Sequence, residues 1–195
     1  MRLIINRTLV FIIILLSIFF TIILNFQNHW SGNLEDFTQV YNSLILNSGF
    51  KAEFHDHPGH SLIYLISIWL NFLDLFNIIK YSSFTEIYNS ENINEILNDV
   101  VFFSKLINLF FLLSFLLILY KFLKIFSKDK TLRLLFVLMF LNSDALLLSI
   151  DILKAEFLSA ICIFTSFYFI SEFINKKPKR KYILYSGFFL CLSIF

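Results

Sequence analysis

The sequence predicts an all-α polytopic membrane protein, and three observations lead to that prediction. The 195-residue chain is 58% hydrophobic, whereas soluble domains average about 45–50%, and its mean hydropathy is +0.76. Long apolar runs without charge recur along it. Its charges are also segregated, because residues 27–99 carry a net −7 and residues 100–195 a net +7. Together these features predict about five transmembrane helices with a long external first loop that carries interfacial helices.

The first span is expected at residues 8–26. A helix of about 20 apolar residues crosses a bilayer core of roughly 30 Å. This run has that length and no charge, and Arg2 and Arg7 precede it. A signal peptide has a shorter apolar core of about 7–15 residues and a small-residue cleavage site, which is missing here. We therefore expect a retained span in the inner (plasma) membrane with a cytoplasmic N-terminus.

Further spans are expected in the second half of the chain. The apolar runs there cover residues 100–120, 132–150, 152–174 and, as the start of a fifth span, 182–195. They are separated by two basic clusters, "KFLKIFSKDKT" and "NKKPKRK". Both clusters should be cytoplasmic, because Lys and Arg concentrate in cytoplasmic loops. The last run makes only about 21 Å of helix, so residues 1–195 are interpreted as one membrane domain, the N-terminal part of a larger protein. A short half-inserted tail is the alternative.

Residues 61–79 decide the topology. If this apolar segment crossed the membrane, both basic clusters would lie outside, against the charge rule. The segment also carries Asn71, Asp74 and Asn77 three residues apart, which places one polar stripe on a helix. We therefore expect an interfacial helix on the outer surface, within a single external loop at residues 27–99. An ordinary span is the alternative.

Two other parts of this loop have patterns of their own. Residues 34–46 are expected to form a short helix on the membrane, ended by Gly49. Residues 80–99 are polar and acidic, and we expect a loop there with one short amphipathic helix.

Three of the four histidines lie in "EFHDHPGHSL", residues 53–62. His55, His57 and His60 have the spacing H-x-H-x-x-H, which is a weak zinc signal because closed sites need four ligands at set spacings. Pro58 disfavours a helix through the preceding residue. A structural turn that lines an acceptor site, contacts to substrate or phosphate, and a metal site all stay open. We expect no tight zinc site.

A second polar cluster interrupts the apolar run at residues 142–157. Its ionisable members are Asp144, Asp151, Lys154 and Glu156. Ionisable residues at membrane depth are costly, and they usually pair or face a cavity. On the expected topology this hairpin tip faces outward. We expect Lys154 to pair with Asp151 or Asp144, or to hold a phosphate. A solvated turn without a catalytic role is the alternative.

The order of these features resembles the N-terminal region of polytopic glycosyltransferases of the GT-C type, which include the protein O-mannosyltransferases and the aminoarabinose transferase of lipid A. In that group the first span leads into an external loop with an acid, an aromatic, a Gly and a His-Pro-Pro-like turn. An interfacial helix and a second span that ends in basic residues follow. The matching positions here are Asp36, Tyr41, Gly49, His57, Pro58, Lys121 and Lys124. The chain departs from the pattern at Gly59, which replaces the second proline, at Lys105, which replaces an Arg, and in lacking the C-terminal half.

The resemblance implies a GT-C-like fold and the transfer of a sugar from a polyprenyl-phosphate donor to a lipid, protein or glycan acceptor on the external face, without nucleic acid. Asp36 is the implied catalytic carboxylate, with Glu156 as its partner. The implied substrate-binding residues are Tyr41, His57, His60, Asp151 and Lys154. No cofactor and no metal site are expected, although a divalent cation stays open. For Asp36 the alternative is the N-terminal acid of a surface helix. For the chain it is a non-catalytic polytopic protein, flippase-like or a scaffold subunit.

Overall fold

The computed structural model of this chain describes residues 33–52, 60–141, 143, 151–175 and 179–193. All regular structure within these ranges is helical, in seven helices, and this confirms the all-helical prediction. Several predicted features lie outside the described residues: the span at 8–26, the second half of the run 132–150, His55, His57, Pro58 and Asp144.

The helix expected at residues 34–46 is present as α2, Leu34–Asn47. The side chain of Asn33 caps its start by accepting a hydrogen bond from the Glu35 N–H at 2.9 Å, as Asn commonly does at this position. Gly49 follows the helix with φ of +80°, a left-handed conformation that glycine adopts without steric cost. Local sequence signals therefore decide both ends of this helix.

A helix is present within the segment predicted at residues 61–79, as α3, His60–Leu75, and its interfacial position stays a prediction. Its polar side chains bind neighbouring segments: Asn71 donates to the Asn47 side chain at 3.0 Å, and Asp74 accepts from the Ser82 hydroxyl at 3.1 Å. The helix ends just before Asn77, which has φ of +56°. The predicted polar stripe thus joins α3 to α2 and to the segment that follows α3.

The loop predicted at residues 80–99 is shorter than expected. It contains α4, Phe84–Tyr88, whose capping box pairs Ser83 with Glu86. Helix α5 then begins at Ile93 and continues to Leu123, so residues 93–99 belong to the long helix and the prediction of a loop there was wrong. The reason is that apolar residues at the start of α5 pack in the same cluster as α2 and α3. These residues of α5 are Ile96, Leu97, Val100 and Val101.

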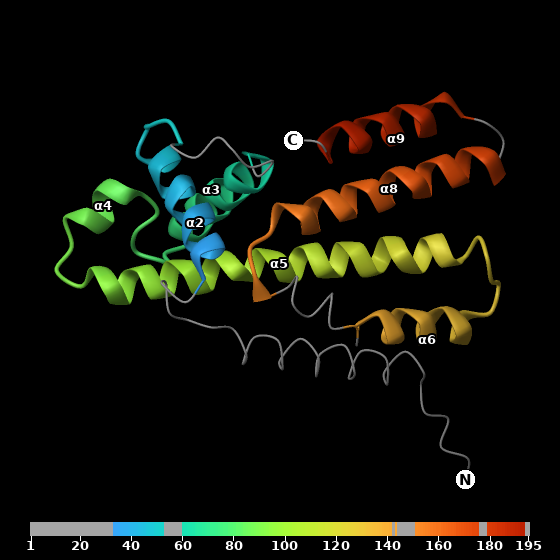
Figure 1. Ribbon diagram of the computed structural model, residues 1–195, viewed down its shortest axis with the longest axis horizontal. Coiled ribbons are helices and arrows are strands. Elements are labelled where there is room, and N and C mark those ends of the chain that lie inside the picture. Colours follow the sequence, from blue (N-terminus) through green and yellow to red (C-terminus); the bar gives the residue numbers. More distant parts are fainter. Residues whose placement is uncertain (1–32, 53–59, 142, 144–150, 176–178, 194–195) are drawn as a thin grey trace, which may run out of the picture.

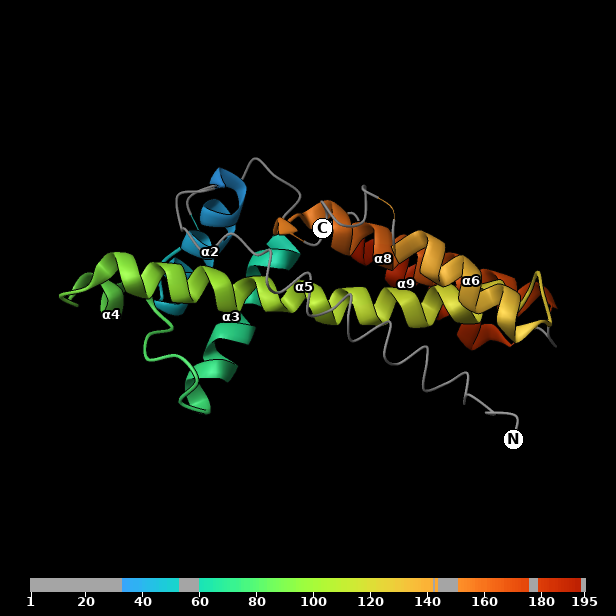
Figure 2. The same ribbon diagram turned by 90° about the horizontal axis from the view of Figure 1, so that it is seen from below.

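Three further helices run alongside the C-terminal half of α5: α6, Lys130–Leu141; α8, Ala155–Asn175; and α9, Arg180–Leu192. By contrast, α2 and α3 cross the N-terminal half of α5 at a steep angle (Figures 1 and 2). Leu112, Leu116 and Phe157 belong to the cluster of buried side chains that joins α5, α6 and α8. The molecule therefore has a helical bundle at one end and a layer of crossing helices at the other.

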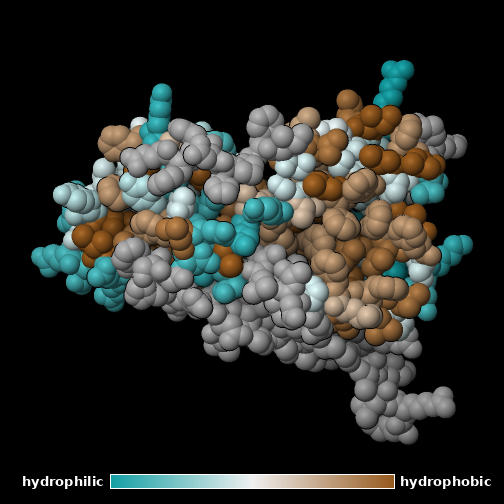
Figure 3. Space-filling view, viewed as in Figure 1, coloured by the Kyte–Doolittle hydropathy of each residue, from teal (hydrophilic) through white to brown (hydrophobic). Residues whose placement is uncertain are grey.

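Two helices of the bundle have the length and the apolar composition of membrane helices. Among the described helices, α5 and α8 are long and apolar enough to cross a bilayer. Many large apolar side chains of α6, α8 and α9 stay exposed (Figure 3). They include Leu135, Phe136, Met139, Phe167, Ile174, Leu184 and Phe188. Such a surface is unusual for a protein surrounded by water, and it agrees with the expectation of a membrane protein.

The two basic clusters lie at the same end of the bundle. Helices α5 and α8 run in one direction, and α6 and α9 return in the other (Figure 1). The turn between α5 and α6 and the start of α9 therefore lie at the same end of the bundle, far from α2, α3 and α4. The charge segregation seen along the sequence becomes a separation between a basic and an acidic end.

Candidate functional site

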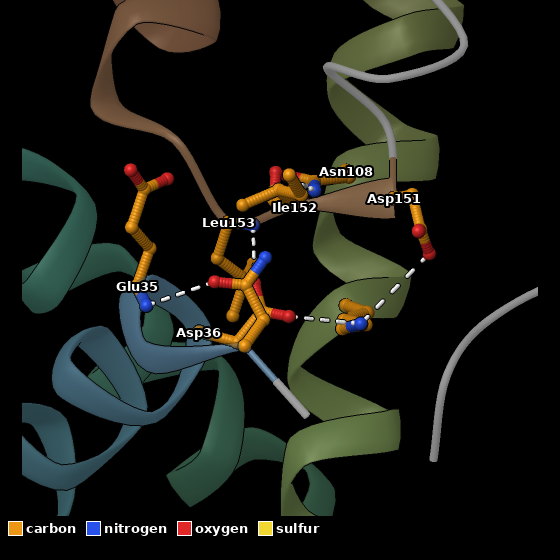
Figure 4. A network of polar contacts seen from close by, with 8 residues as sticks. Glu35, Asp36, Asn108, Asp151, Ile152 and Leu153 are labelled. Carbon is orange, nitrogen blue, oxygen red and sulfur yellow. Dashed lines mark hydrogen bonds and ion pairs between the residues drawn. The ribbon is translucent and has the colours of Figure 1, made fainter. Parts of the chain in front are cut away.

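A buried ion pair joins α2 to α5 at the acidic end. Asp36 lies in the first turn of α2, and its Oδ2 is 2.9 Å from the Lys105 Nζ of α5 (Figure 4). Both side chains are only 2% exposed. A buried charge is costly unless it is paired and hydrogen-bonded. The pair therefore holds the start of α2 against α5.

The second oxygen of the Asp36 carboxylate binds the segment that precedes α8. Its Oδ1 accepts a hydrogen bond from the Leu153 N–H at 2.6 Å. One residue earlier, the Ile152 carbonyl accepts a hydrogen bond from the Asn108 side chain of α5 at 3.1 Å. Side chains thus satisfy peptide groups that a helix would otherwise pair internally. For this reason α8 begins at Ala155, three residues after the start of the predicted span.

Two opposing influences act on the Asp36 carboxyl. Burial raises the pKa of this carboxyl above its ordinary value, and the nearby Asp151 carboxylate raises it further. The hydrogen bond from the Leu153 N–H and the Lys105 ammonium group lower the pKa. Burial is the largest influence, and the net pKa is raised. Both carboxylate oxygens of Asp36 already have partners, so its contacts are those of a residue that holds α2 against α5 and against the segment before α8. Its expected catalytic role stays a prediction.

The two charged residues beside this joint have separate partners. Asp151 Oδ1 lies 3.8 Å from the Lys105 Nζ, and Lys154 Nζ lies 3.6 Å from Glu35 Oε2. Of the three alternatives predicted for Lys154, the pairing with Asp151 is wrong, Asp144 lies outside the described residues, and the phosphate role stays a prediction. Residues 152–154 are not helical, and this segment carries Asp151 toward α5 and Lys154 toward α2.

A shallow pocket of about 160 Å³ lies between the first turn of α2 and the start of α8. Its charged lining residues are Glu35, Lys154 and Glu156. Glu156 is exposed, and Glu35 is 59% exposed. Gln39 also lines the pocket, and its Oε1 is buried without a hydrogen-bond partner. The pocket thus offers two accessible carboxylates and an ammonium group.

The other predicted substrate-binding residues lie elsewhere. Tyr41 stacks on Phe37 and contacts Phe84 edge-on, with ring centroids 5.7 and 5.5 Å away, and it lines a separate apolar pocket. Successive helix residues turn by about 100°, so Tyr41 points roughly 140° away from Asp36. His60 is the first residue of α3 and is half-buried. The described residues contain no group of three side chains suited to a metal ion; because His55 and His57 lie outside them, the expectation about zinc stays a prediction.

The structural roles of Lys105 and Asn108 were not predicted, although the sequence contains a pattern that indicates them. Lys105 and Asn108 are polar residues in an otherwise apolar run, and their spacing of three places them on one face of a helix. Polar groups inside a span usually find a partner, and these two bind Asp36 and Ile152. No comparable pattern marked Gln39.

Comparison with known proteins returned no matching family model, no matching curated protein and no matching solved structure.

Proposed function

We propose that this chain is a multi-pass domain of the plasma membrane and a GT-C-type glycosyltransferase. It moves a sugar from a polyprenyl-phosphate donor to a lipid, protein or glycan acceptor on the external face, and its N-terminus is cytoplasmic. One observation carries the proposal: Glu35, Glu156 and Lys154 line a single pocket next to the buried Asp36–Lys105 pair. The pocket supplies the carboxylate and the cation that such a transfer needs.

Each group in the pocket has a part in the proposed reaction. The oxygen of the acceptor hydroxyl bonds to the anomeric carbon while the bond from that carbon to the phosphate oxygen breaks. The exposed Glu156 carboxylate takes the acceptor proton, and Glu35 assists it. Lys154 neutralises the departing phosphate. Asp36 positions the 152–154 segment through Leu153.

The lysine in the pocket provides the first test. In the full-length protein, Lys154→Met should lower transfer of a labelled sugar from its lipid carrier. A hydrogen bond to a charged group contributes about 1.5–3 kcal/mol, and each 1.36 kcal/mol is tenfold in rate, so the expected loss is roughly 10- to 100-fold. Lys80→Met changes an exposed lysine between α3 and α4 that does not line this pocket, so it is the matched control and should keep near-normal transfer. Equal rates for both variants would count against the phosphate role of Lys154.

A second candidate function is a non-catalytic polytopic membrane protein, flippase-like or a scaffold subunit. The complete pairing of Asp36 favours it, because a carboxylate with both oxygens engaged can act purely as a structural joint. This alternative predicts that a folded, full-length wild-type protein transfers no sugar from any polyprenyl-phosphate donor.

The proposed orientation can be tested with single cysteines. Cys162 and Cys191 are first replaced by serine. Glu91→Cys, between α4 and α5, should react with a membrane-impermeant thiol reagent added outside intact cells. Lys128→Cys, in the turn between α5 and α6, should react only after the membrane is permeabilised. Both positions are exposed and lie at opposite ends of the molecule (Figure 1). The reverse labelling pattern would invert the topology.

A further inference from the structure

Arg133 is a buried cation at the basic end of the bundle. It lies in the first turns of α6 and is only 5% exposed. Its guanidinium lies over the ring of Tyr120, with Cζ 4.6 Å from the ring centroid. Its Nε has no hydrogen-bond partner, and no described acidic residue forms an ion pair with it. A buried N–H of a charged group that has no acceptor is energetically unfavourable, so the Nε side of Arg133 lacks a partner among the described residues.

The nearest acidic residue in the sequence does not complete it. Asp129 precedes Arg133 by one helical turn, but its Oδ1 accepts a hydrogen bond from the Thr131 N–H at 2.8 Å. Asp129 therefore caps the start of α6, a role favoured for Asp. It is exposed, whereas the Arg133 guanidinium is buried. An anion from outside the described residues fits the chemistry of Arg133.

The surface around Arg133 has the composition of a membrane interface. Exposed lysines surround the turn between α5 and α6, at positions 121, 124, 128 and 130. Phe126, between them, is 73% exposed. The basic residues 179–181 lie at the same end of the bundle (Figure 1). Basic clusters beside transmembrane helices attract the headgroups of anionic lipids, and aromatic residues accompany them at the interface.

We propose that this end of the bundle binds the phosphate group of an anionic phospholipid, with Arg133 as its anchor. The guanidinium donates hydrogen bonds in a planar fork that matches phosphate oxygens. The exposed apolar side chains of Leu132, Leu135 and Phe136 on α6 provide a surface for acyl chains, which favours a lipid over free phosphate. The proposal goes beyond sugar transfer and depends only on membrane placement.

The test measures thermal unfolding of the purified full chain in an uncharged detergent. Phosphatidylglycerol should raise the melting temperature of the wild-type protein, because a ligand that binds only the folded state stabilises it. Phosphatidylcholine and inorganic phosphate should not. Arg133→Gln should bind phosphatidylglycerol at least about tenfold more weakly and lose the shift. Lys128→Gln removes the same charge from an exposed position and should keep most of the shift.

The melting temperatures of the Arg133 variants without lipid show whether Arg133 binds lipid or only stabilises the fold. Arg133→Gln removes an unpaired buried charge, so without lipid it should melt at or above the wild-type temperature. Arg133→Lys keeps the charge but loses the planar fork, and it should fold normally while binding phosphatidylglycerol more weakly. A full lipid-induced shift in either Arg133 variant would overturn the proposal. An equal shift with inorganic phosphate would show that the ligand is a free anion.

Discussion

Replacing Glu156 with glutamine should lower sugar transfer by the full-length protein about 10²–10⁴-fold, the range typical for removing a general base. Glu156 lines the pocket and is exposed, so the substitution keeps the size of the side chain and should leave folding intact. Transfer of a labelled sugar from its polyprenyl-phosphate carrier is measured at matched expression. The loss should appear mainly in kcat, because the proton is transferred in the transition state.

Two matched variants make this test specific. Glu91→Gln removes an exposed glutamate outside the pocket and should leave transfer unchanged. Asp36→Asn separates the roles of the two acids. If Asp36→Asn folds with normal stability but transfers no sugar while Glu156→Gln stays active, Asp36 is the base and Glu156 is not.

Breaking the buried pair should have the largest effect on stability. Lys105→Met leaves the Asp36 carboxylate buried without its cation, and removal of one partner of a buried pair costs about 3–5 kcal/mol. The free energy of unfolding is measured in mixed detergent micelles. Glu35→Gln breaks the exposed pair with Lys154 and serves as the control. Exposed pairs contribute only about 0–1 kcal/mol, so that variant should unfold almost as wild type does.

A double variant tests whether the lower free energy of unfolding of Lys105→Met comes from the unpaired Asp36 carboxylate. Asp36→Asn combined with Lys105→Met removes both charges, and the asparagine oxygen can still accept from the Leu153 N–H. Replacement of a whole buried pair by uncharged groups is often nearly neutral. The double variant should therefore be more stable than Lys105→Met alone. Additive losses from the two substitutions would show that Asp36 and Lys105 stabilise the fold independently of each other.

The positions of several helices were predictable because local signals decide them. Asn33 and Gly49 bracket α2, and a cap and a left-handed glycine act within one turn of the chain. The helix boundaries that differ from the predicted segments depend on distant partners. Helix α5 begins earlier because its first turns pack in a cluster with α2 and α3, and α8 begins later because Asp36 and Asn108 bind residues 152 and 153.

The candidate site was predictable in composition but not in arrangement. Ionisable residues in an apolar run are costly, and this identified Asp151, Lys154 and Glu156 as candidates. Asp36 was a candidate because it follows the first expected span by about ten residues. Their partners did not follow from spacing, because the carboxylate and the N–H that meet in the bond between Asp36 and Leu153 are 117 residues apart. Asp36 pairs with Lys105, and not with the lysine at position 154, because Lys105 lies on the face of α5 that packs against α2.

Composition, apolar periodicity and charge distribution alone specify a helical chain with membrane-like spans, a polar segment between them and two basic clusters, because these properties depend on residues near one another in the sequence. Folding decides the rest. It buries Asp36 against Lys105 and leaves Glu35 and Glu156 accessible, although Glu35 and Asp36 are neighbours in the chain. Adjacent helix residues point about 100° apart, so the packing of α2 on α5 selects which of the two carboxylates becomes a joint and which one faces the pocket.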